Sequence, residues 1–268
     1  MNADRSDFMG KGMRERRGGV TSRQPISDFG GSGRSVSGVV FCAKSGRHSG
    51  MVPATVYTRR EELANIATHG VGIVLSLIGL AWVVTLSSLE GDAWQIVGTT
   101  IFGVTLVLLY TTSTLYHGFR HERRKQIMRK FDHAAIFLLI AGSYTPFLLV
   151  SLRGLLGWIL FGVVWGLAVV GIALKFRYAG RFRVVSTLIY IAMGWLVLTV
   201  FGPLSAALPS TGVWLLVAGG LCYTGGAAFY LWKRLPYHHA VWHLCVMAGS
   251  ICHWSAVFLY VVPRPLAG

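Results

Sequence analysis

The sequence predicts an all-α fold, a bundle of seven transmembrane helices with a cytoplasmic N terminus and an external C terminus. Three observations predict it. The chain is 53% hydrophobic and only 13% charged, it contains seven long apolar segments, and its basic residues fall in alternate gaps between them. Because a soluble domain usually carries about 25% charged residues, the composition argues against a water-soluble protein.

Each apolar segment is long enough to form a spanning helix, since about 20 helical residues cross the ~30 Å hydrocarbon core of a bilayer. Segments of this length are too long for strands, and their interior glycines are tolerated because small residues let membrane helices approach closely. The expected helices cover residues 66–89, 93–116, 131–152, 155–174, 184–204, 213–232 and 237–262.

Residues 1–55 differ from the rest of the chain, because Arg, Gly and Ser dominate them and no apolar run is long enough for a signal peptide. Such a segment buries too little apolar surface to offset the entropy lost on ordering. We therefore expect a disordered basic tail over 1–55 and a membrane domain over 56–268. Met51 is an alternative start, because a basic, helix-initiating stretch follows it directly.

The basic residues predict the orientation through the positive-inside rule. Of 25 Lys and Arg residues, all but Arg153 and Arg264 fall on one side of a seven-span topology. That side is predicted to be cytoplasmic, so the chain is expected to be a multi-pass protein of the inner (plasma) membrane. The net charge of +15 then reflects orientation and attraction to anionic membrane lipids, and no nucleic-acid partner is expected.

Polar residues of three expected helices reach one depth near the cytoplasmic face. His117 ends the second helix, with Ser113 one turn deeper on the same face, and Asp132 begins the third. His239 and His243 begin the seventh helix, and their four-residue spacing puts both imidazoles on one face. Three neutral imidazoles with an open fourth position are typical of catalytic zinc, so the pattern indicates a metal site.

A structural alternative stays open for every histidine, which can also be an interfacial or core residue hydrogen-bonded to a carbonyl. We prefer it for three of them. His133 faces differently from the neighbouring acid, His238 falls in a loop, and His253 lies about 15 Å deeper than His243 by helical rise. A carboxylate such as Asp132 costs about 2.5 to 3.5 kcal/mol at the centre of a membrane, which generally marks a partner or a functional site.

Glu62, Asn65 and His69 are expected together at the inner end of the first helix. They help to close the metal site. Asn65 could instead cap the helix.

Four ordered motifs within residues 61–260 resemble those of a known family: Glu62-x-x-Asn65-x-x-Thr68-His69-Gly70, Ser113-x-x-Tyr116-His117, the run from Phe131-Asp132-His133 to Ser143-Tyr144-Thr145-Pro146-Phe147, and His239-x-x-Trp242-His243. At these residues the sequence resembles the hemolysin III family of bacterial membrane proteins, relatives of the progestin and adipoQ receptors.

The resemblance implies a seven-helix bundle that binds zinc through His117, His239 and His243 on the cytoplasmic side. It also implies that Asp132 holds a water at the zinc and that Ser113 supports the site. The wider superfamily includes ceramidases, so the expected function is a metal-dependent hydrolase acting on membrane lipid amides or esters. In this chemistry zinc lowers the pKa of water toward ~7, and Asp132 accepts the proton.

Two other function classes stay open. The chain could be a non-enzymatic, receptor-like or membrane-homeostasis regulator with structural zinc, or a cytolysin that forms pores, as the family name suggests. The sequence argues against the cytolysin, because helices with apolar outer faces suit co-translational insertion rather than release toward another cell. The expected partners are membrane lipids, with a lipid or other small molecule as the substrate.

Overall fold

The computed structural model describes residues 57–178 and 182–262, and in these residues all secondary structure is helical. The all-α prediction is therefore confirmed. The tail expected over 1–55 lies outside the described residues, so its disorder stays a prediction.

The described residues form eight α-helices, one π-helical turn and one 3-10 segment. In chain order they are α1 (Arg59–Glu90), α2 (Ala93–Gly118), α3 (Glu122–Pro146), η1 (Phe147–Ser151), α4 (Leu155–Arg177), α5 (Arg183–Gly194), η2 (Trp195–Val200), α6 (Phe201–Ala207), α7 (Ser210–Leu231) and α8 (His238–Tyr260). With α3 and η1 counted as one span, and α5, η2 and α6 as another, seven segments are long and apolar enough to cross a membrane.

Two helices begin well before the apolar segments that predicted them. α1 starts at Arg59 rather than residue 66, because the Thr58 side chain and Glu61 form a reciprocal capping box at its first turn. α3 starts at Glu122 rather than residue 131. The apolar pattern marks only the part of a helix that lies in hydrocarbon. The helical backbone hydrogen bonds continue beyond that part.

The helix expected over 184–204 is not continuous, which corrects the sequence prediction. α5 ends at Gly194, and the chain passes through η2 before α6 begins at Phe201. The Tyr144 hydroxyl of α3 holds the first break by donating to the Gly194 carbonyl (2.7 Å) and accepting from the Val197 N–H (2.9 Å). Pro203 lies in the first turn of α6, where its missing N–H costs least.

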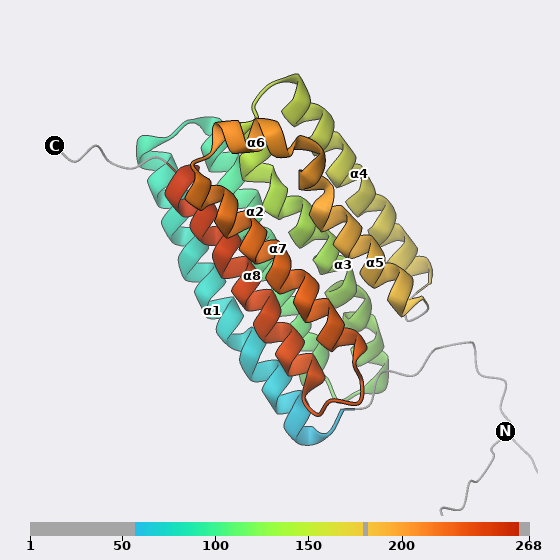
Figure 1. Cartoon of the computed structure of the whole chain (residues 1–268). Coiled ribbons are helices and arrows are strands. Elements are labelled where there is room, and N and C mark those ends of the chain that lie inside the picture. Colours follow the sequence, from blue (N-terminus) through green and yellow to red (C-terminus); the bar gives the residue numbers. More distant parts are fainter. Residues whose placement is uncertain (1–56, 179–181, 263–268) are drawn as a thin grey trace, which may run out of the picture. The chain divides into compact units, whose positions relative to one another are not determined.

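The helices pack side by side into a closed bundle (Figure 1). α2 packs against both α1 and α3, α8 packs against α1 and α7, and α5 packs against α3 and α7. α4 lies against α3 and η1 on the outside of the bundle. Large apolar side chains such as Val74, Ile78 and Val169 stay exposed on the outer faces, as expected for surfaces that meet lipid.

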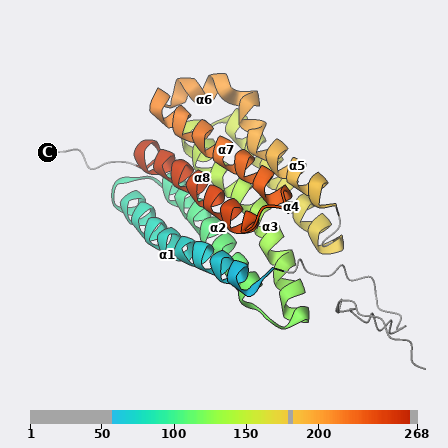
Figure 2. The same ribbon diagram turned by 60° about the horizontal axis from the view of Figure 1, so that its bottom comes forward.

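One end of the bundle gathers the segments that carry the predicted site. Figure 2 shows the beginnings of α1, α3 and α8 close to this end, which we call the inner end, and α2 also ends there. The topology therefore brings residues that are distant in sequence to the same depth.

Candidate metal site

Three buried histidines converge at the inner end of the bundle. His117 comes from the last turn of α2, and His239 and His243 come from the first turns of α8. One ring nitrogen of each lies within 4.8 Å of the other two, and the Nε2 atoms of His117 and His239 are 3.1 Å apart. This group could hold a metal ion.

The other ring nitrogen of His117 makes a hydrogen bond to a residue of α1. Its Nδ1 lies 2.6 Å from the Glu62 carboxylate, whose second oxygen accepts from Lys125 Nζ of α3. An ionised carboxylate only accepts hydrogen bonds, so His117 donates Nδ1–H to it, and the lone pair of the neutral ring is on Nε2, which faces His239. The Asn65 amide lies 3.4 Å from the same Nδ1.

His243 is held in the same tautomer by Thr68 of α1. The two side chains are 3.1 Å apart, between Nδ1 and Oγ1. The single hydroxyl proton of Thr68 is directed to the backbone carbonyls of Ala64 (2.9 Å) and Asn65 (3.0 Å). Thr68 therefore accepts from His243 Nδ1–H, which leaves Nε2 with the lone pair.

These contacts fit a metal-ligating role. Metal-bound histidines almost always donate their second N–H to a carboxylate, carbonyl or water, which fixes the ring and raises its basicity. His117 and His243 both donate their second N–H to an oxygen, and the Tyr57 ring stacks on His239 at a centroid distance of 5.2 Å. Three imidazoles with these outer contacts match the donor set of zinc and of other borderline divalent metals.

The two residues predicted to carry catalysis line the same cavity as two of the histidines. Ser113 is 1% exposed and Asp132 is 7% exposed, and both line the cavity that His239 and His243 also line. The catalytic roles of both residues stay predictions.

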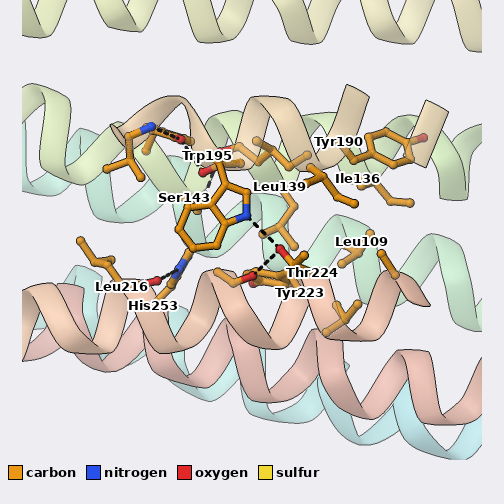
Figure 3. A pocket seen from close by; sticks show the side chains of 18 of the residues that line it. Leu109, Ile136, Leu139, Ser143, Tyr190, Trp195, Leu216, Tyr223, Thr224 and His253 are labelled. Atoms are coloured by element: carbon orange, nitrogen blue, oxygen red, sulfur yellow. Dashed lines mark hydrogen bonds between the residues drawn. The ribbon is translucent and has the colours of Figure 1, made fainter. Parts of the chain in front are cut away.

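The cavity encloses about 170 Å³ and runs from the histidines toward the outer half of the bundle. Its walls come mainly from α3, α5, η2, α7 and α8 and are largely apolar. Polar side chains also occur along the cavity wall (Figure 3). Trp195 Nε1 donates to Thr224 Oγ1 (2.9 Å), and His253 Nε2 lies 3.2 Å from the Leu216 carbonyl. Leu198 and Phe201 line the cavity and are also 58% and 44% exposed, so its wall reaches the lipid-facing surface.

The remaining histidines are placed only partly as expected. His253 is bonded to a backbone carbonyl, as its structural interpretation requires. His133 lines the same cavity as Asp132, and its structural interpretation stays a prediction. His238 is the first residue of α8 and is buried, so its assignment to a loop is also wrong. Tyr57 contributes to this burial, because its ring packs against that of His238.

Sequence reasoning grouped Glu62, Asn65 and His69 at the inner end of α1 but did not predict which histidines they contact. The N-cap of α1 is Thr58, so Asn65 is not a helix cap and instead contacts His117. The His69 ring stacks on His243 with a centroid distance of 3.5 Å. The spacing of Glu62, Asn65 and His69 was the available signal, because three- and four-residue steps put them on one face of a helix.

Comparison with known proteins yields a family and several relatives. The family model described as "Haemolysin-III related" matches residues 57–254. The chain is 45% identical over 210 residues to "Hemolysin-3 homolog" of Bacillus subtilis (strain 168), which covers 78% of this chain and 99% of the relative. It is 46% identical over 204 residues to "Hemolysin-3" of Bacillus cereus, covering 76% and 93% of the two chains. It is also 29% identical over 211 residues to the human "Monocyte to macrophage differentiation factor", covering 76% and 86%.

Proposed function

This chain belongs to the haemolysin-III related family of multi-pass plasma-membrane proteins, and we propose that it is a zinc-dependent hydrolase that cleaves the amide or ester bond of a membrane lipid. The observation that carries the proposal is one juxtaposition. The buried nitrogens of His117, His239 and His243 converge, and His239 and His243 line the inner end of a cavity that Asp132 and Ser113 also line.

The histidines would hold the metal through one nitrogen each, with Glu62 and Thr68 fixing two of the rings. A zinc ion bound there supplies a Lewis acid that polarises a carbonyl and makes water acidic enough to ionise near neutral pH. Asp132 is the general base of the proposal, since its carboxylate can accept the proton of an attacking water. The Ser113 hydroxyl lines the same cavity, where it would orient the water or the carboxylate.

The apolar cavity favours a lipid as the substrate. A lipid chain entering past Leu198 and Phe201 would stay in an apolar environment while its amide or ester group reached the histidines. An apolar, water-poor site also strengthens the electrostatic interactions that stabilise charge in the transition state.

The test combines metal analysis with hydrolysis of an N-acyl lipid by purified, zinc-supplemented protein. We expect wild-type protein to retain about one zinc per chain, and His117→Ala, His239→Ala or His243→Ala to lose it, because each removes a direct ligand. Asp132→Asn should keep most of the zinc but lose about 10²- to 10⁴-fold in hydrolysis, the usual contribution of a general base.

Each outcome separates the candidate functions. Stoichiometric zinc without hydrolysis of lipid amides or esters would favour the non-enzymatic regulator, in which the metal is structural. Wild-type protein without zinc after supplementation would contradict both the enzyme and the structural-zinc regulator. Zinc loss caused by His253→Ala alone would show that the wrong histidines have been assigned.

A further inference from the structure

His69 of α1 faces the proposed active site but has no role in holding the metal. Its side chain is 3% exposed and lines the same cavity as Ser113 and Asp132. Within the described residues, the nitrogens that converge are those of His117, His239 and His243, and neither nitrogen of His69 joins them.

The orientation of the His69 ring is fixed by two aromatic neighbours. It stacks on His243 at a centroid distance of 3.5 Å with an interplanar angle of 12°. The Tyr110 ring meets it edge to face, with a centroid distance of 5.1 Å and an angle of 71°. The imidazole is therefore held against a proposed ligand, with little freedom to turn toward another partner.

Neither ring nitrogen of His69 is satisfied. Both are buried, and neither has a hydrogen-bond partner in the described part of the chain. A buried polar group without a partner costs free energy, so it calls for an explanation. Packing does not explain it, because a phenylalanine would stack on His243 and Tyr110 without burying two polar nitrogens. A ligand in the cavity would supply the missing partner.

We propose that His69 is a substrate-contact residue, whose imidazole N–H donates a hydrogen bond to the carbonyl oxygen of a lipid acyl group bound in the cavity. The proposal rests on the proposed function, because the acyl group is the part of the substrate that must reach the histidines. A neutral imidazole offers one N–H donor. The carbonyl oxygen gains negative charge as an amide or ester is hydrolysed, so a fixed donor at this point stabilises the transition state.

The experiment measures binding of a small acyl probe without relying on turnover. Purified protein is loaded with Co²⁺ in place of zinc, and acetohydroxamate is titrated while the visible absorption of the cobalt is recorded. His69→Phe keeps an aromatic ring on His243 but removes the donor, whereas His69→Gln restores an N–H at this position. Tyr223→Phe is the matched control, because it removes one hydroxyl from the wall of the same cavity next to Ser250.

We expect all three variants to keep the cobalt spectrum of the wild type. His69→Phe should bind acetohydroxamate about tenfold more weakly, the loss expected for one hydrogen bond. His69→Gln should recover part of the affinity, and Tyr223→Phe should bind as the wild type does, since Ser250 lies about 10 Å along α8 from His243.

Three results would overturn the inference alone, and a fourth would overturn it together with the proposed function. Unchanged probe affinity in His69→Phe would show that the imidazole contacts no acyl group. Equal weakening in His69→Phe and His69→Gln would show that an N–H at this position does not restore binding, against a donor role. Loss of cobalt from His69→Phe would make His69 part of the metal site. If the wild type itself binds no cobalt, the proposed function fails, and this inference fails with it.

Discussion

Glu62 and Thr68 of α1 determine which nitrogens of His117 and His243 face the metal site. Each accepts a hydrogen bond from Nδ1–H of its histidine, which leaves the lone pair of the neutral ring on Nε2. Glu62 is also shared with Lys125 of α3. A metal bound to these histidines would thus depend on α1, which contributes none of the three converging nitrogens.

Replacing Glu62 should therefore weaken zinc binding without removing a ligand. We expect Glu62→Ala to lower zinc affinity about 10- to 100-fold, the typical effect of losing an outer partner of a metal-bound histidine. Glu122→Gln is the control, because it removes an exposed carboxylate from the beginning of α3. Competition with a chromophoric chelator measures both affinities. Equal zinc affinity in Glu62→Ala and the wild type would mean that Glu62 does not support the ligand.

The sequence predicted the three converging histidines but not the residues that hydrogen-bond to them from outside. The four-residue step from His239 to His243 is a local property of one helix, so it is visible in the sequence. The pairing of Thr68 with His243, in contrast, depends on how α1 packs against α8. His133 illustrates the same limit, because its place on the cavity wall depends on the arrangement of α5 and α7 around it.

At the scale of elements, composition predicted the seven spans but not their internal breaks. Insertion into a bilayer depends on the apolar content of a segment, which is read directly from the sequence. The break after Gly194 instead depends on Tyr144, a residue of another helix whose hydroxyl satisfies the backbone at the break. Pro203 is a local signal for the start of α6, since proline is best tolerated in the first turn of a helix.

Tyr144→Phe should destabilise the junction between α5 and η2. The change removes the hydrogen-bond partner of the Gly194 carbonyl and of the Val197 N–H, and a lost hydrogen bond costs about 0.5 to 1.5 kcal/mol. Tyr178→Phe is the control, because Tyr178 is 43% exposed at the end of α4. Thermal unfolding in detergent should show a lower midpoint for Tyr144→Phe alone. Identical midpoints for the two variants would contradict this account of the break.

The α7–α8 contact depends on glycine at Gly219. A Cβ at this position would lie 2.3 Å from the His253 ring and 3.1 Å from the Gly249 carbonyl oxygen. We expect Gly219→Ala to lower the free energy of unfolding by about 1 to 3 kcal/mol through overpacking. Gly225 lies on the same helix, and a Cβ added there would meet no heavy atom within 4 Å, so Gly225→Ala should be neutral or slightly stabilising. Unfolding in detergent compares the two, and equal stability would contradict the close packing.

For the whole molecule, closure of the bundle brings the site together. α1 packs against α2 and α8, and this packing unites residues from the first, second and last spans at the inner end. The basic residues near the inner end predict on which side of the membrane it lies. Lys125, Arg129 and Lys130 lie near this end, at the beginning of α3. The positive-inside rule then predicts that the proposed active site opens on the cytoplasmic half of the bilayer.

Reporter fusions test this orientation. A reporter that is active only in the cytoplasm should be active when inserted at Arg124, in the basic segment between α2 and the apolar part of α3. The same reporter should be inactive after Gly268, because seven spans put the two ends of the chain on opposite sides. A second reporter that is active only outside should give the inverse pattern and serves as the control for expression. Activity of the cytoplasmic reporter at Gly268 but not at Arg124 would reverse the orientation and move the histidines to the external half of the membrane.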